Sequence, residues 1–461
     1  MAEEKNISTN EIETLRDALS DGAFGTEGAV DENDAVADEA LVEDFISMFG
    51  VEGNTPLKGH DWVISIPSSI LEYKSGTKNS LYGVVREETE SIYILDYPQY
   101  RNTDHFLGDI IVSNSEQAKR DDEWHDEWLN ISSCKRAVNY PYNLKLTGTA
   151  IDGDLQIEME RISPDGDVME KIPVRIKQYD TVTNLFSRNA GLLESSAMLD
   201  KRAVLVGCGS VGSFVAMQLA RSGVGKFVLC DTDTLEIHNI CRHQCGFDDL
   251  GRYKVDAVKD KILNINPNAE VITYRSIIQR VPEEELMPLL GRNTIIIGGG
   301  DNRGSADWAC KLAIKTDSTF VSTGCWTRAF AGEIFYWASG RNLSCYSCAL
   351  GGLIDEDRPE SHATYFGSDE EKETLSFEPG IAADIDFVTI IAVKLALDLL
   401  NRDNENYTPR VIDYLKQYTW VCNTNSTKIG GPRAAMFPAP LWITNNLTVN
   451  KDADCPFCGN K

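Results

Sequence analysis

The clearest apolar pattern in the chain begins at Ala203. The apolar run 203–206 predicts a buried strand, and apolar side chains at helical spacing through Ala220 predict a helix after it. A second apolar run, 227–230, predicts another buried strand, which ends on Asp231. Strand, helix and strand in this order are typical of a βαβ unit in an α/β fold with a mostly parallel, Rossmann-like sheet.

A glycine-rich turn, GCGSVG at 207–212, separates the first strand from the helix. Such a turn lets phosphates approach the backbone N–H groups at the start of a helix. An acid at the end of the next strand, here Asp231, can accept hydrogen bonds from ribose hydroxyls. Alone, this pattern is weak evidence and would point to NAD. The turn positions expected to bind a nucleotide are Gly207, Gly209, Ser210 and Gly212.

The residues that follow Asp231 favour a nucleoside triphosphate over NAD. A triphosphate needs cations for its phosphates, and the Mg²⁺ that accompanies it needs a carboxylate. The sequence supplies both at the ends of predicted strands. The candidate cations are Arg242 and Lys254, and the candidate carboxylates are Asp233 and Asp301. Asn239 and Asn302 lie in the same segments and are further candidates.

Together with Gly251, these residues closely resemble the motifs of the ThiF/MoeB/HesA superfamily, the adenylating core of ubiquitin-activating enzymes. The resemblance covers residues 181–461. Arg303 lies close to a position where the family carries an arginine. The sequence departs from the family pattern at Ser210 (usually Gly), His238 (usually Ser), His243 (usually Gln) and Ala306 (usually Arg).

The resemblance implies adenylation by ATP of the C-terminal carboxylate of a ubiquitin-like or sulfur-carrier protein, which is then passed to a partner such as a conjugating enzyme. It implies that Asp301 holds Mg²⁺, that Arg242 and Lys254 bind phosphates and that Asn239 contacts ATP. The segment LFSRN, 185–189, looks like the family segment whose arginine, here Arg188, reaches into the ATP site of a neighbouring protomer. We therefore expect a homodimer.

Four of the twelve cysteines form two CxxC pairs. Four thiolates from two such pairs give Zn²⁺ a closed tetrahedral shell, which is typical of a structural site. Two accidental CxxC pairs, or a redox pair, are the alternatives. The predicted zinc ligands are Cys345, Cys348, Cys455 and Cys458.

The net charge of −27 argues against binding to nucleic acid. Residues 1–50 contribute −12 of it, which predicts a flexible acidic tail over 1–60. Short apolar and alternating runs predict a β-rich accessory or partner-binding module over 61–180, including a hairpin that leads through the turn at 164–166 into 174–176. The sequence has neither a signal-peptide pattern nor a long uncharged apolar segment, so we expect a cytoplasmic chain that does not enter a membrane.

The crossover segment 349–380 has no cysteine, although full activating enzymes carry their acyl-accepting cysteine there. The sequence therefore predicts adenylation without a thioester, with Cys325, Cys245 and Cys422 as the remaining candidate nucleophiles. Two alternatives stay open. One is adenylation of a short ribosomal peptide in natural-product biosynthesis, and the other is a non-catalytic nucleotide-binding module used for assembly.

Overall fold

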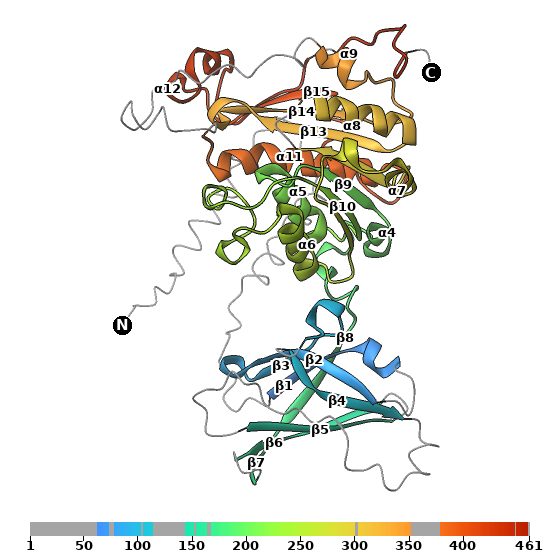
Figure 1. Ribbon diagram of the computed structural model, residues 1–461, viewed down its shortest axis with the longest axis vertical. Helices are drawn as coiled ribbons and strands as arrows, with labels where there is room; N and C mark the ends of the chain where they lie inside the picture. The colour runs from blue at the N-terminus through green and yellow to red at the C-terminus, as the bar shows by residue number, and fades with distance from the viewer. Residues whose placement is uncertain are drawn as a thin grey trace, which may run out of the picture. The chain divides into compact units, whose positions relative to one another are not determined.

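The computed structural model describes two eight-stranded sheets, which Figure 1 shows in the colours of the sequence. None of the helices in the described ranges is long and apolar enough to cross a membrane. The predicted tail at 1–60 and residues 352–378 of the crossover segment lie outside these ranges. The structure describes residues 62–72, 78–102, 105–113, 143–151, 154–163, 167–299, 303–351, 379–447 and 449–459.

The first sheet has the strand order β7-β6-β5-β4-β2-β3-β1-β8. Its core consists of inward-facing aliphatic side chains with Trp62, among them Ile64, Ile66 and Ile92, which are fully buried. The strands are β1 (Trp62–Pro67), β2 (Lys78–Arg86), β3 (Ser91–Ile94), β4 (Phe106–Ser113), β5 (Asn143–Ile151), β6 (Asp154–Ile162), β7 (Val168–Ile172) and β8 (Val174–Tyr179).

The predicted hairpin into 174–176 is wrong. Strand β6 pairs antiparallel with β7, whereas β8 pairs parallel with β1, from Trp62 opposite Val174 onward. The sequence pattern does not indicate β7, because its apolar side chains, Val168 and Met169, are consecutive and exposed and show no alternation. The pairing of β8 with a strand more than a hundred residues earlier leaves no local signal.

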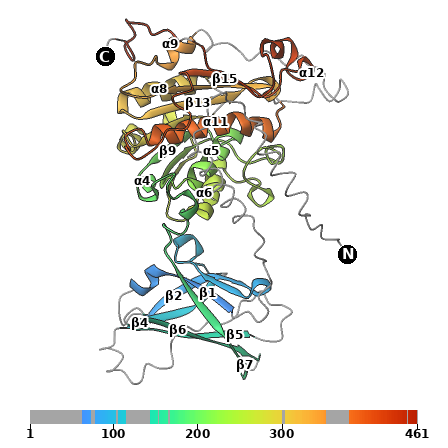
Figure 2. The ribbon, with the colours of Figure 1, turned by 180° about the vertical axis from the view of Figure 1, so that it is seen from behind.

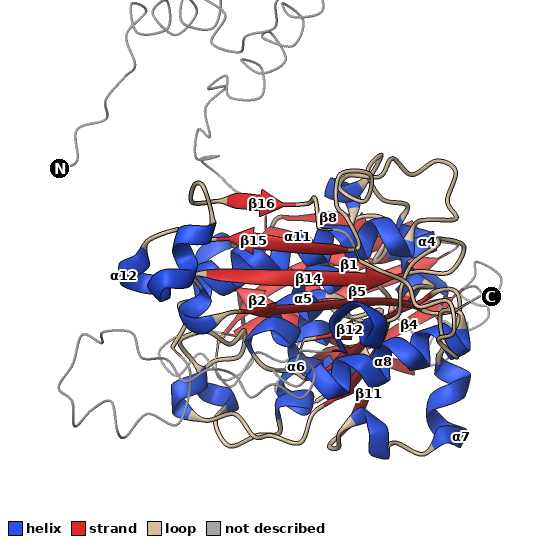
Figure 3. Ribbon diagram, turned by 90° about the horizontal axis from the view of Figure 1, so that it is seen from above, coloured by secondary structure: helices blue, strands red, loops and turns tan. Residues whose placement is uncertain are grey.

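The second sheet has the order β11-β10-β9-β12-β13-β14-β15-β16. Neighbouring strands from β11 to β13 are parallel, as predicted, and β14, β15 and β16 continue the sheet antiparallel, side by side in Figure 3. The strands are β9 (Arg202–Val206), β10 (Lys226–Cys230), β11 (Glu270–Tyr274), β12 (Thr294–Gly298), β13 (Thr319–Cys325), β14 (Ala331–Trp337), β15 (Tyr418–Cys422) and β16 (Trp442–Thr444).

Helices cover both faces of the parallel strands (Figures 1 and 2). Leu205 belongs to a core shared with α5, α6 and α11, whereas its neighbour Val204 packs into a second core with α8. Burial on both faces explains why these strands read as continuous apolar runs. The helices are α4 (Ser195–Leu199), α5 (Ser210–Arg221), α6 (Lys254–Ile265), α7 (Glu283–Leu286), α8 (Arg303–Thr316), α9 (Tyr346–Leu350), α11 (Ala382–Leu400) and α12 (Thr427–Gly430).

The strand order reverses between β9 and β12. From β9 the chain continues to β10 and β11 on one side, and it then returns to β12 and β13 on the other. In open α/β sheets, ligands bind outside the carboxyl ends of the strands at this reversal. The glycine-rich turn follows β9 directly, and Gly299 after β12 donates a hydrogen bond to the carbonyl of Val206 (3.2 Å). The fold therefore places the predicted nucleotide turn at the reversal point.

Candidate nucleotide site and cysteine cluster

The glycine-rich turn has the geometry of a phosphate-binding turn. Gly207 has φ of +96°, and a Cβ on Gly212 would lie 2.0 Å from the carbonyl oxygen of Gly207, so neither position tolerates a larger residue in this conformation. A Cβ on Gly209 would meet nothing within 4 Å, so this position faces open space. The site thus leaves room for a ligand beside Gly209.

Helix α5 begins at Ser210, immediately after this turn. The first hydrogen bond of the helical pattern runs from the N–H of Ser213 to the carbonyl of Gly209, the residue before α5 (2.9 Å). The N–H groups before Ser213 have no acceptor within an α-helix, and together with the helix dipole they favour an anion. The residues fit the phosphates of a nucleotide.

Asp231 connects the turn to the loop that follows β10. One of its carboxylate oxygens accepts the N–H of Cys208 (2.7 Å), and the other accepts the N–H of Asp233 (2.8 Å). Each carboxylate oxygen has a second lone pair, so both can still accept a ribose hydroxyl. This carboxylate positions the backbone of both the turn after β9 and the loop after β10.

Lys254 is a buried cation beside Asp233. Its Nζ lies 3.0 Å from Oδ2 of Asp233, and its backbone N–H donates to the carbonyl of the same residue (2.9 Å). Lys254 is the first residue of α6, and an isolated bridge between Thr234 and Tyr253 aligns the two segments. The structure thus brings Asp231, Asp233 and Lys254 together at one end of the sheet.

The loop between β10 and α6 contains Asn239, Arg242 and His243. The side-chain oxygen of Asn239 accepts the N–H of Glu236 (3.0 Å), so Asn239 stabilises the loop in addition to its predicted place in the ATP-contacting segment. Arg242 is partly exposed, whereas His243 is buried and its ring lies 2.7 Å from the carbonyl oxygen of Cys208. The sequence analysis recorded His243 only as a departure from the family pattern.

Arg188 lies at the other end of α5. It is exposed on a short 3-10 helix, Ser187–Asn189, and the side chain of Asn189 donates to the carbonyl of Arg221, the last residue of α5 (2.9 Å). A helix of 12 residues is about 18 Å long, so α5 separates Arg188 from the glycine-rich turn at its start. The structure does not bring Arg188 to the nucleotide turn of its own chain.

Asp301 and Asn302 lie outside the described residues. Arg303, the first residue of α8, donates to Glu333 (3.0 Å), whose other carboxylate oxygen accepts Nε1 of Trp326 (3.2 Å) and the hydroxyl of Tyr418 (2.7 Å). Ala306 is buried in the core under α8, so that position points away from solvent. The sequence pattern does not indicate Glu333, because its partners Arg303 and Tyr418 come from distant segments.

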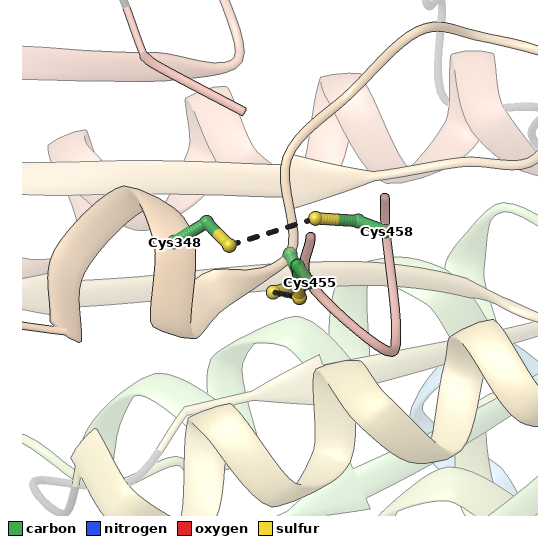
Figure 4. A group of neighbouring side chains, drawn as sticks. Cys348, Cys455 and Cys458 are labelled. Atoms are coloured by element: carbon green, nitrogen blue, oxygen red, sulfur yellow. Dashed lines mark hydrogen bonds between the residues drawn. The ribbon is translucent and has the colours of Figure 1, made fainter. Parts of the chain in front are cut away.

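The four predicted zinc ligands form one cluster. Their sulfur atoms all lie within 4.8 Å of one another, and Figure 4 shows Cys348 facing Cys458, at 3.7 Å. Burial raises the pKa of the Cys345 thiol, which disfavours a bare thiolate there. A bound Zn²⁺ would stabilise the deprotonated sulfurs, and four thiolates without an open position are the donor set of a structural zinc site.

A hydrogen bond and a cation–π contact connect the segments of the cysteine cluster to α8. Ser347, between two of the cysteines, hydrogen-bonds to Asp307 of α8, which also pairs with Lys311 (2.5 Å). The Lys311 ammonium lies over the ring of Phe457, 5.1 Å from its centroid. A metal at the cluster would therefore join the C-terminal segment to the helix that begins directly after Asn302.

The family model described as the ThiF family matches residues 183–426. The chain is therefore an α/β protein with a Rossmann-like sheet, and it belongs to the ThiF family. A ubiquitin-like modifier-activating enzyme 5 from Caenorhabditis elegans is 25% identical over 195 residues, 39% of this chain and 45% of the relative. A molybdopterin-synthase adenylyltransferase from Salmonella typhimurium is 27% identical over 172 residues, 35% of this chain and 63% of the relative.

The chain spans about half the length of the first curated relatives that it matches, 45% and 50%. Among solved structures, MccB of E. coli with ATP aligns with a TM-score of 0.42 and 18% identity, over 60% of this chain and 74% of that chain. The family assignment rests on the sequence match over 183–426.

The cysteine cluster makes a stability prediction. The purified chain should contain about one zinc per chain, and replacing Cys345 and Cys348 by Ser should release it and lower the melting temperature, because a structural site contributes directly to folding free energy. Elemental analysis and thermal unfolding measure both effects. Cys241→Ser, at an exposed cysteine outside the cluster, is the control and should keep the metal. A zinc-free wild-type protein would contradict the assignment.

Proposed function

We propose that this chain uses ATP to adenylate the C-terminal carboxylate of a ubiquitin-like or sulfur-carrier protein. The carrying observation is that Asp231 joins the phosphate turn to the loop in which Asp233 holds Lys254, within a ThiF-family chain. The names of the relatives support an acceptor of this class, since they include a ubiquitin-like modifier-activating enzyme and a molybdopterin-synthase adenylyltransferase.

The reaction joins a carboxylate oxygen of the acceptor to the α-phosphorus of ATP and breaks the bond between the α- and β-phosphates. The products are an acyl-adenylate and pyrophosphate. The carboxylate is already ionised, so the step needs no general base. Two anions must approach each other, and preorganised positive charge is the main way to lower that barrier.

In this proposal Asp231 binds the ribose, and the N–H groups at the start of α5 bind phosphate. Lys254 and Arg242 add positive charge for the phosphates. Mg²⁺, held by Asp301 with Asn302 beside it, would neutralise phosphate charge. Lys254 already pairs with Asp233 at 3.0 Å, so a phosphate would share or replace that contact.

The proposal extends to the rest of the chain. Residues 1–60 form an acidic tail, residues 61–180 an accessory or partner-binding module, and residues 181–461 the adenylating domain with its C-terminal zinc-binding segment. The activated acceptor is handed to a partner protein, such as a conjugating enzyme, inside the cytoplasm.

Pyrophosphate exchange tests the adenylation proposal. The wild-type chain should incorporate labelled pyrophosphate into ATP only when its acceptor is present, and Asp301→Ala should lower this rate at least about 100-fold, the scale of one lost electrostatic contact. Asp413→Ala, at an exposed acid away from the turn, is the control and should retain the rate.

Candidate acceptors are carrier proteins with small-residue tails and short ribosomal peptides, assayed in parallel. Exchange with peptides alone would replace the carrier-protein proposal by the peptide alternative. No exchange with any acceptor, together with ATP binding, would favour the non-catalytic module.

We also propose a homodimer in which Arg188 completes the site of the other protomer. The glycine-rich turn of the same chain lies at the opposite end of α5 from Arg188. Apolar residues on the loop after β10 are exposed, with Ile237 at 62% and Phe247 at 69%, as expected of a surface that a second protomer covers.

Mixing two inactive variants tests this arrangement. Arg188→Ala and Asp301→Ala should each be inactive alone, and an exchanged mixture should recover about one quarter of wild-type activity, because half of the dimers are mixed and each of these has one intact site. The measurement is pyrophosphate exchange after subunit exchange has been shown by mass spectrometry. A mixture that stays inactive would mean that Arg188 does not act across an interface.

We expect no thioester between this chain and its acceptor. Burial raises the pKa of the Cys245 thiol to about 12 and also raises the pKa of Cys422, so both stay protonated and are poor nucleophiles. Cys325 is only partly buried. A non-reducing gel of enzyme, ATP and acceptor should therefore show no thiol-sensitive adduct. An adduct that disappears in Cys325→Ser would overturn this prediction.

A further inference from the structure

His243 has a fixed tautomer. The backbone N–H of Cys245 donates to Nδ1 of the ring (3.1 Å), so Nδ1 is the unprotonated acceptor. The hydrogen is then on Nε2, which donates to the carbonyl oxygen of Cys208 (2.7 Å). The residue is 7% exposed, and burial lowers the pKa of the imidazole, so the ring is neutral near pH 7.

The carbonyl that His243 contacts belongs to the centre of the phosphate turn. The N–H of Cys208 is held by Asp231 and its carbonyl by His243, so both polar groups of this residue are fixed from outside the turn. The Cys208 side chain is fully buried in the core beneath. These three contacts leave little freedom for Gly207 and Gly209 on either side.

We propose that His243 is a positioning residue that holds the glycine-rich turn in its nucleotide-accepting conformation. It touches neither ATP nor the acceptor, and it acts through the carbonyl of Cys208. This inference deepens the adenylation proposal and rests on it for the identity of the nucleotide. It requires a side chain that donates one hydrogen bond and accepts another in the same place.

Glutamine meets the same requirement, since its amide has an N–H donor and a carbonyl acceptor. The motif that the chain resembles usually carries glutamine at this position. Leucine fills a similar volume without either polar group, so His243→Leu would leave the Cys208 carbonyl and the Cys245 N–H unsatisfied. The pair Leu and Gln therefore separates hydrogen bonding from packing.

Protonation should weaken the same contact. A proton on Nδ1 would face the N–H of Cys245, which places one donor against another. The charged groups around the ring are Lys254, which lowers the pKa of His243, and Asp231 and Asp249, which raise it. Because the net shift is downward, the loss should appear only on the acid side of the ordinary histidine range.

The experiment measures ATP binding by calorimetry without acceptor and the KM for ATP in pyrophosphate exchange. His243→Leu should weaken ATP binding and raise this KM about tenfold, the equivalent of one lost hydrogen bond of about 1.4 kcal/mol, with a smaller effect on kcat. His243→Gln should restore both values to within about threefold of wild type. His105→Leu, directly before β4 of the first sheet, is the matched control and should change neither value.

The pH profile gives a second readout that packing alone does not move. Wild-type ATP binding should weaken on the acid side of the ordinary histidine range, and His243→Gln should lack this additional loss. This comparison of wild type with His243→Gln also tests the positioning role of His243 if His243→Leu does not fold.

Three results would overturn the inference: unchanged ATP binding in His243→Leu, equal losses in the Leu and Gln variants, or the same acid profile in wild type and His243→Gln. Failure of the adenylation proposal looks different. In that case the wild type binds ATP, with the expected order of the variants, but shows no pyrophosphate exchange.

Discussion

The carboxylate of Asp231 is the contact on which the nucleotide site depends. Its two oxygens hold the N–H of Cys208, in the turn after β9, and the N–H of Asp233, in the loop after β10. The turn and the loop come from neighbouring strands, and the His243 ring adds a second contact between them at the Cys208 carbonyl. Because Asp233 in turn holds Lys254, one carboxylate sets the relative positions of the helix start and of the cation that we propose binds phosphate.

Charge compensation is the second feature of the site. The chain carries a net charge of −27, yet the proposed triphosphate site needs positive charge. Lys254 is held by Asp233 and Arg303 by Glu333, so each cation is kept in place by an acid before a nucleotide arrives. Buried charges require such partners. A nucleotide with Mg²⁺ must then compete with Asp233 for Lys254, which makes this ion pair part of the binding equilibrium.

Local patterns predicted much of this molecule. The sequence predicted β9, β10, the glycine-rich turn and Asp231, because each of these features depends only on residues close together in the chain. The cysteine cluster could be read because CxxC spacing is specific. Features that depend on distant partners could not be predicted from local patterns. The pairing of β8 with β1 and the Arg303–Glu333 ion pair are examples.

His243 illustrates the same limit within the site. The sequence showed an unusual residue beside Arg242, but only the fold shows which carbonyl its ring contacts. The resemblance implies that Arg188 reaches into the ATP site of a neighbouring protomer, and the fold adds that it lies at the far end of α5 from its own turn. The role of Asp301 as the Mg²⁺ ligand stays a prediction from the resemblance.

The central claim is that ATP activates a carboxylate through its α-phosphate. The most direct measurement incubates the chain and its acceptor with ATP labelled at either the α- or the γ-phosphate, and then follows the label. The account predicts that the α-label appears on the acceptor as a hydroxylamine-sensitive adenylate while the γ-label leaves in pyrophosphate. Transfer of the γ-label to the acceptor, or release of γ-labelled inorganic phosphate without an acceptor adenylate, would contradict it.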